Sequence, residues 1–225
     1  MRERILRALF TGLLLLLAST VMGHASNGMT FSVAAPPSCT RGTCPALIVA
    51  QGEITQDSYR SFEAVARSLP PYVPVVLNSN GGSFLGGIML GLTLRQHGSP
   101  VLVPRGAVCA SACAYAFLGG VVRQAPEGSR IGVHRFIAVN RYTGQRSMSY
   151  ERSVTPQALA LLTNYVQAMG ASPSLVGLAA RVEPSRIHFL NRRELQQYRI
   201  VTGGAPAARR LTRHGRVGSH RRKRG

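Results

Sequence analysis

The sequence predicts an α/β fold, a single domain of repeated ββα and βαβ units around a mostly parallel sheet. Short continuous apolar runs at 46–50, 73–77 and 101–103 are typical of strands that are buried on both faces. The segments between these runs carry apolar residues at helical spacing. Strands that alternate with helices favour parallel pairing through right-handed crossovers.

The chain opens with a predicted secretory signal at 1–25. Three arginines form its charged start, an apolar run follows at 8–22, and small residues stand at both recognition positions of the cleavage site, Gly23 and Ala25. The apolar run is shorter than the roughly 20 residues of a membrane span, and an uncleaved anchor is the alternative. We expect an exported protein, and the excess of arginine over lysine, typical of a GC-rich genome, favours a Gram-negative periplasm.

A short N-terminal segment, 26–45, precedes the main domain and contains the first two of four cysteines. These cysteines fall into two close pairs, Cys39 with Cys44 and Cys109 with Cys113. An even count in an exported protein indicates disulfides, and we favour local pairing among the three possible connectivities. The second bridge would brace the turn between its two cysteines. Buried thiols are the alternative.

The main domain is expected to span 46–203. Its helices are predicted at 56–69, 83–96, 155–169, 173–181 and 192–198, with a late short strand at 187–190. The helix at 155–169 begins at a Thr-Pro pair, which is a common start signal.

Positive charge is concentrated in the last segment, 204–225, which we expect to be disordered. The chain has a formal net charge of +19, and this tail contains eight basic residues and no acid, so the folded part keeps about +9. A tail of this composition can bind a polyanion. In an exported protein the expected partners are anionic lipids or other acidic envelope polymers, with no specific nucleic acid. A solvated tail without a partner is the alternative.

Three short motifs carry the candidate chemistry. They are Asn78-Ser-Asn-Gly-Gly82 after an apolar strand, Cys109-Ala-Ser-Ala-Cys113 at the start of a small-residue helix, and Gly132-Val-His134 at a strand end. Ligands of parallel sheets bind beyond the carboxyl ends of the strands, where glycines let backbone amides approach a reacting carbonyl. Because Lys223 is the only lysine, a serine nucleophile here must use histidine as its base.

With these motifs in this order, the chain resembles the proteolytic subunit of the Clp protease, within the ClpP/crotonase superfamily, over about 46–202. The resemblance implies a ClpP/crotonase-like domain and a serine hydrolase, most simply a peptidase, acting on peptides or proteins without a cofactor. It implies Ser111 as nucleophile, His134 as base, and the amides of Gly81 and Ala112 as oxyanion donors, with Gly82 beside them. Asn80 replaces the proline that the family usually carries. A homo-oligomer is left open.

The third catalytic position departs from the family pattern. Clp-type proteases place an aspartate where this chain has Ile187. The only aspartate, Asp57, suits a helix N-cap. We consider Glu183, a backbone carbonyl or an asparagine as the partner of His134. Without an acid we expect a Ser-His dyad with weaker catalysis, and the alternative is a catalytically silent module that binds peptides or assembles with partners.

Other functional classes fit less well. The Gly-x-Ser-x-Gly motif of α/β-hydrolases is absent, and export argues against the acyl-CoA substrates of the crotonase branch. No histidine lies at ligand spacing near either cysteine pair, so no metal site is expected.

Overall fold

The computed structural model describes residues 28–35, 46–136 and 156–202. The expected signal, the Cys39–Cys44 pair and the basic tail lie outside these residues. In chain order the elements are β1 (Thr30–Ala34), β2 (Leu47–Gln51), α2 (Ser58–Ala66), β3 (Val75–Asn78), α3 (Phe84–Gln96), β4 (Val101–Leu102), β5 (Val108–Ala110), α4 (Ala112–Leu118), β6 (Arg123–Gln124), β7 (Arg130–Val133), α5 (Pro156–Ala168), α6 (Ser174–Arg181), β8 (His188–Phe189) and α7 (Arg192–Gln197).

The strands form two sheets. The larger has the order β1-β2-β3-β4-β6 and the smaller β5-β7-β8. Only β1 with β2 and β7 with β8 pair antiparallel, and all other described pairs are parallel. A parallel bridge between Ser79 and Cys109 brings β5 against the chain that leaves β3. The predicted α/β class with a mostly parallel sheet is therefore confirmed.

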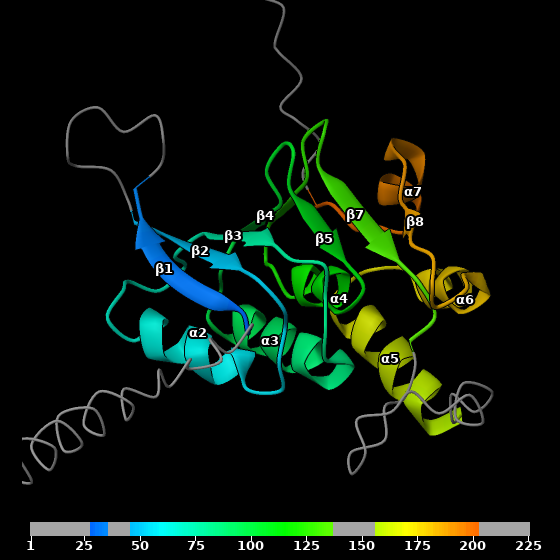
Figure 1. The fold of residues 1–225 in the computed structure, drawn as a ribbon, viewed down its shortest axis with the longest axis horizontal. Helices are drawn as coiled ribbons and strands as arrows, with labels where there is room; N and C mark the ends of the chain where they lie inside the picture. Colours follow the sequence, from blue (N-terminus) through cyan, green and yellow to red (C-terminus); the bar gives the residue numbers. More distant parts are fainter. Residues whose placement is uncertain (1–27, 36–45, 137–155, 203–225) are drawn as a thin grey trace, which may run out of the picture.

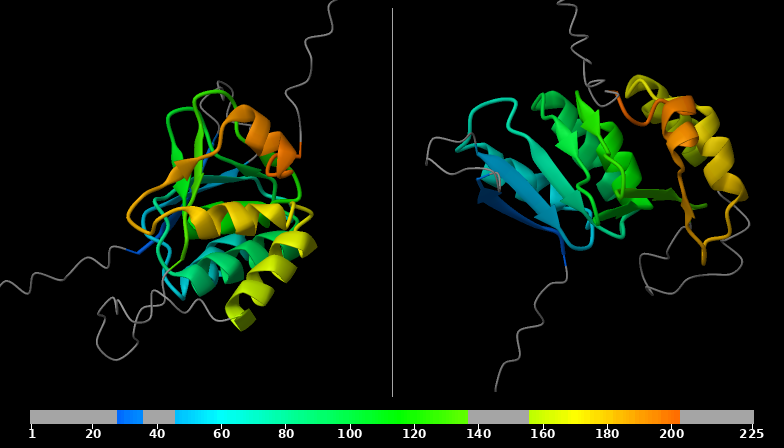
Figure 2. Two further views of the ribbon diagram at one scale, coloured as in Figure 1. Left: turned by 90° about the vertical axis from the view of Figure 1, so that its right-hand side faces the viewer. Right: turned by 90° about the horizontal axis from the view of Figure 1, so that it is seen from above.

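The helices pack around one continuous core. Helices α2 and α3 lie on the same side of the large sheet (Figure 1), where Phe62, Leu90 and Leu94 are fully buried. Helix α4 is buried along its whole length. Figure 2 shows, in its right-hand view, the N-terminal strands on one side of the molecule and the C-terminal helices on the other, with the α4 region between them.

The structure differs from the sequence-based expectation at the N-terminal segment. Residues 26–45 were expected to precede the domain, but Thr30–Ala34 pairs with β2 as the edge strand of the large sheet. None of its five residues is buried: three are exposed, among them Val33 at 50%, and two are partly covered. An edge strand with this exposure lacks the continuous apolar run of a buried strand, so its sequence gives little signal.

Two arginines join the C-terminal helices to the core. Arg123 is 2% exposed and donates to the carbonyls of Leu118, Gly120, Met169, Arg199 and Ile200. Arg95 donates to the carbonyls of Leu118, Gly119, Gly120 and Met169. We call these two side chains the arginine clamp. Its acceptors lie at the ends of α4, α5 and α7, where helix carbonyls are unpaired and the helix dipole is negative.

Within the described ranges, no helix combines the length and the apolar character that a membrane crossing requires.

Candidate active site

Ser111 lies at a sharp turn between β5 and α4. Its backbone angles are φ 56° and ψ −123°, a conformation that L-residues rarely adopt and that costs roughly 1–3 kcal/mol. The amide of Ser111 donates to the carbonyl of Gly132 at 2.9 Å, which ties the turn to β7. The hydroxyl forms no capping bond with α4. The turn therefore leaves the side chain available for another partner, as the strained turns of nucleophilic serines do.

That partner is His134, which follows directly after β7. Its Nε2 lies 2.7 Å from Ser111 Oγ, and its Nδ1 lies 2.8 Å from the carbonyl oxygen of Arg135. A carbonyl only accepts, so Nδ1 must carry the proton in this contact. The unprotonated Nε2 then accepts from the Ser111 hydroxyl. The tautomer assigned in this way is the one that a general base for serine requires.

The carbonyl of Arg135 is itself held in place by the end of α6. The Arg135 amide donates to the carbonyl of Val182 at 3.1 Å, and the Arg135 guanidinium lies 3.3 Å from the Glu183 carboxylate. The residue that carries the His134 acceptor is therefore held to the start of the α6–β8 connection by both its amide and its side chain.

Glu183 does not partner His134. Its side chain is 65% exposed and pairs with Arg135, and no hydrogen bond or ion pair joins it to His134 within the described part of the chain. The candidate contact between Glu183 and His134 is thus absent, and the carboxylate pairs with the oppositely charged Arg135 instead. Ile187 occupies the position opposite His134 if the β7–β8 register is extended by one pair.

The glycine pair after β3 packs directly against the Ser111 turn. A side chain on Gly81 would clash with the Ala110 carbonyl and with Ser111 Cβ, both 2.7 Å from its Cβ position. Gly82 has φ 137°, and its Cβ position is blocked by the Ile54 carbonyl. Only glycine fits at either position, because the backbone itself approaches the turn.

The candidate oxyanion donors are not equally available. The Gly81 amide donates to Ser79 Oγ at 3.1 Å and so already has an acceptor. The Ile54 amide donates to the Gly81 carbonyl, and the Ile54 carbonyl accepts from the Ser83 amide. The Gly82 amide lies between these two bonds and points away from Ile54. Within residues 28–35, 46–136 and 156–202, neither the Gly82 amide nor the Ala112 amide has an acceptor. Ala112 begins α4, where unpaired amides and the positive end of the helix dipole favour an anion.

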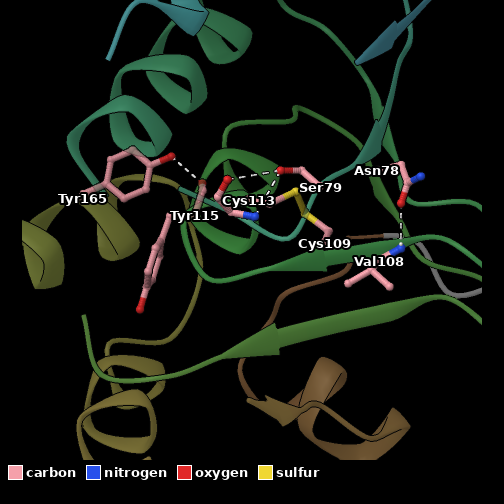
Figure 3. Close-up of a disulfide and its surroundings, with 8 residues drawn as sticks. Asn78, Ser79, Val108, Cys109, Cys113, Tyr115 and Tyr165 are labelled. Atoms are coloured by element: carbon pink, nitrogen blue, oxygen red, sulfur yellow. Dashed lines mark hydrogen bonds between the residues drawn. A yellow bond between two sulfur atoms is a disulfide. The ribbon is translucent and has the colours of Figure 1, made fainter. Parts of the chain in front are cut away.

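A disulfide brackets the candidate nucleophile. Cys109 in β5 and Cys113 in α4 are bonded across a Cα–Cα distance of 5.0 Å, as Figure 3 shows. Both cysteines are completely buried. The predicted local pairing is confirmed for this pair, and it joins the strand before Ser111 to the helix after it.

Three aromatic residues, which the sequence analysis did not single out, border the site. Phe84, two residues after Gly82, stacks on Phe136, two residues after His134, with ring centroids 4.3 Å apart. Tyr115 meets Phe84 edge to face and is 2% exposed. Burial raises the pKa of the Tyr115 hydroxyl far above its usual value, so this group stays neutral. The stacked rings of Phe84 and Phe136 thus also join the segment after the glycine loop to the segment after His134.

A pocket of about 560 Å³ runs along the chain that leaves β3. Its walls are the ends of β2 and β3 and the start of β5, where Asn78 Oδ1 accepts from the Val108 amide at 3.1 Å. Figure 3 shows this contact in the same view as Ser79 and the disulfide. The pocket ends at Gly81 and Gly82, beside the Ser111 turn.

The two other histidines of the described ranges have structural partners. His97 follows α3 and contacts Ser99 Oγ at 3.1 Å, while its ring meets Phe62 edge to face. His188 contacts Glu194, which also closes a capping box with Asn191 at the start of α7. Neither ring approaches a serine in the way His134 does.

Comparison with known proteins gives similarity at the level of structure. No family model matches the sequence, and no curated protein matches it. Among solved structures, a serine-to-alanine mutant of the membrane-bound stomatin-specific protease 1510-N is 19% identical, with a TM-score of 0.48 over 66% of this chain and 73% of that chain. A lysine-to-alanine mutant of the same protease, in complex with a substrate peptide, is 20% identical, with a TM-score of 0.47 over 66% and 69%.

A mutant of ClpP1 from Listeria monocytogenes is 16% identical, with a TM-score of 0.46 over 66% of this chain and 84% of that chain. These likenesses concern the course of about two thirds of the chain and do not identify which residues react.

Proposed function

We propose that this protein is an exported serine hydrolase, specifically a peptidase, in which Ser111 and His134 act as a catalytic dyad. The observation that carries the proposal is the 2.7 Å contact between Ser111 Oγ and His134 Nε2, with Nδ1 protonated toward the Arg135 carbonyl. A nucleophile within hydrogen-bond reach of a base that is oriented by a third group is the geometric pattern of activated serines. The strained backbone at Ser111 is a second, independent support.

The proposed reaction proceeds in two proton-balanced halves. His134 Nε2 takes the Ser111 proton as Oγ attacks the substrate carbonyl, and the oxyanion forms against the amides of Gly82 and Ala112. The protonated Nε2 then gives its proton to the leaving amine. In the second half a water molecule attacks the acyl carbonyl and gives a proton to Nε2, which passes this proton to Ser111 Oγ as the ester bond breaks and the acid product leaves. One such amide donor is typically worth about 3 kcal/mol of transition-state stabilisation.

The reaction is expected to be slower than with a full triad. A carboxylate would stabilise the imidazolium with a full negative charge, whereas the Arg135 carbonyl offers only a dipole. The carbonyl nevertheless supplies the correct tautomer, which is the larger part of what the acid does.

Labelling with a fluorophosphonate probe tests the assignment. The mature chain is expected to react at Ser111, and both Ser111→Ala and His134→Ala should abolish labelling to a similar extent, because the two groups act as a unit. Ser68→Ala is a matched control, since this exposed serine bonds only the carbonyl of Val65. Labelling that persists in Ser111→Ala would refute the site.

A silent peptide-binding module remains the second candidate, and the observation behind it is the apolar Ile187 opposite His134. It predicts that the wild-type chain binds peptides but resists the probe. A Ser111–His134 separation far beyond about 3.5 Å would have favoured this module, and the 2.7 Å contact favours the enzyme.

We further propose that the tail at 204–225 tethers the exported protein to anionic lipids or acidic polymers of the envelope. Its eight basic residues without an acid support this, and each contributes at most about 1 kcal/mol near an anionic surface, screened by salt. Mature protein, identified by an N-terminus at Ser26, should bind anionic vesicles at low salt and dissociate as salt rises. A chain ending at Gly203 should bind much less. Equal binding of both chains would remove the tail from this role.

A further inference from the structure

Among the described residues, the pocket beside the glycine loop is lined by a single ionisable side chain. Gln51, Asn78 and Asn80 contribute carboxamides, and Glu53 contributes a carboxylate. Glu53 is exposed and has no ion-pair or hydrogen-bond partner within the described part of the chain. Of the other described acids, Asp57, Glu183 and Glu194 each pair with a basic side chain, whereas Glu63 and Glu127 form no ion pair and lie outside the pocket. An unpaired carboxylate among neutral hydrogen-bonding groups gives this pocket a negative character in an otherwise basic protein.

Glu53 lies at the end of the pocket that adjoins the candidate nucleophile. Its Cγ is 2.8 Å from the Cβ position of Gly82, and the Cβ position of Gly81 is 2.7 Å from Ser111 Cβ. Two glycines therefore separate Glu53 from Ser111. Gln51 lies toward the other end, since it pairs in register with Asn78.

The carboxamides of the pocket suit an extended peptide. Asparagine and glutamine side chains can both donate to a carbonyl and accept from an amide, so they can pair with a peptide backbone of any sequence. The volume of about 560 Å³ lies within the range of roughly 300–1,000 Å³ that ligand pockets usually occupy. Backbone contacts of this kind would not select a side chain, and the one group in the pocket that could select by charge is Glu53.

We propose that Glu53 selects a lysine or arginine side chain, placed within a residue or two of the scissile bond in a peptide substrate. This inference rests on the proposed function, because it concerns the same substrate. The cationic group would lie over the carboxylate while the neighbouring carbonyl lies at Ser111 and the Gly82 amide. Glu53 is a specificity-determining residue in this arrangement and takes no part in proton transfer.

Paired peptide substrates test the proposal. Peptides that differ only in arginine or citrulline next to the cleaved bond have nearly the same shape, so their kcat/KM ratio reports charge. The wild-type chain is expected to prefer arginine up to about fivefold, which is the upper end of the range for an exposed charge pair. Glu53→Gln should bring the ratio close to one, mainly through KM, and Glu53→Arg should reverse it. Glu127→Gln removes an equal charge from the turn before β7 and should leave the ratio unchanged.

Separate readouts distinguish failure of the Glu53 role from failure of the peptidase function. Suppose that the fluorophosphonate labels Ser111. An arginine-to-citrulline ratio of one in the wild type, or the same ratio in the wild type and in Glu53→Gln, then refutes the role of Glu53 and leaves the peptidase function intact. If the probe does not label, peptidase function fails, and binding of the same peptides by fluorescence anisotropy still tests the pocket. Equal affinity for arginine and citrulline peptides in that assay would refute the cationic preference as well.

Discussion

At the scale of single residues, the site is defined by contacts that are made by the backbone as much as by side chains. His134 contacts the carbonyl of Arg135, the candidate oxyanion donors are the amides of Gly82 and Ala112, and Ser79 occupies the amide of Gly81. Backbone groups do not vary with the residue type that carries them. A site of this kind can therefore retain its geometry although Ile187 stands where the Clp pattern has an aspartate.

Restoring an acid should raise the reactivity of Ser111. Ile187 is 36% exposed, and its side chain lies over Gly132, on the face to which His134 belongs by strand alternation. We expect Ile187→Asp to increase the rate of fluorophosphonate labelling roughly tenfold, equivalent to about 1.4 kcal/mol, because a carboxylate stabilises the imidazolium better than a dipole does. Ile187→Asn has nearly the same shape without the charge. Equal rates for the two variants would show that charge at this position does not reach the base.

At the scale of elements, the β5–turn–α4 unit is the mechanical support of the site. Strand β5 pairs in parallel with β7, so the two elements that present Ser111 and His134 share one register, Ala110 with Gly132. The disulfide then closes the turn on its other side. Ser111 is held from both sides in a conformation that it would not keep by itself.

Removing this disulfide should affect reactivity more than folding. A bridge across so short a loop stabilises the folded state by only about 2 kcal/mol, while it fixes the strained turn directly. Cys109→Ser with Cys113→Ser is expected to slow probe labelling at least tenfold and to leave the far-ultraviolet circular dichroism spectrum unchanged. The control is the double variant Cys39→Ser with Cys44→Ser, which is expected to label at the wild-type rate. Equal labelling rates in the two double variants would mean that the Cys109–Cys113 bridge does not support the turn.

The elements that sequence reasoning predicted best are those with long periodic patterns. Predicted helices at 83–96 and 155–169 agree closely with Phe84–Gln96 and Pro156–Ala168. In α5 the apolar spacing over three turns records the buried face, whereas α3 is a long apolar segment that also exposes Leu85 and Met89. The close approach of Ser111 and His134 followed from motif order and the family resemblance. The acceptor for His134 could not be predicted, since any residue after the histidine offers the same carbonyl and only the α6–β8 packing places it.

At the scale of the whole molecule, the arginine clamp determines how the C-terminal helices attach. Burial, and then the nearby Arg95 charge, lower the pKa of Arg123 to about 10. The guanidinium nevertheless remains protonated near neutral pH, and its charge is met by helix carbonyls alone among the described residues. No sequence pattern indicated this role, because arginines are ordinarily exposed.

Loss of the clamp should destabilise the fold strongly. Arg123→Met leaves several buried carbonyls without a donor, so we expect the free energy of unfolding to fall by about 3–5 kcal/mol, the range for breaking a buried charged network. Arg123→Lys should recover only part of it, because an ammonium lacks the planar fork that reaches several carbonyls. Urea denaturation measures both, with Arg193→Met on the exposed side of α7 as the control. A change below 1 kcal/mol in Arg123→Met would contradict this role.

The clamp also has a consequence for behaviour in acid. Most buried charges in proteins are met by carboxylates, which protonate as the medium acidifies and then release their partner. Peptide carbonyls have no such titration, and the lowered pKa of Arg123 still lies far above acidic values. The hydrogen bonds from the clamp to the ends of α5 and α7 therefore involve no group that titrates between neutral and acidic pH. Acid that protonates carboxylates elsewhere in the fold leaves these particular contacts in place.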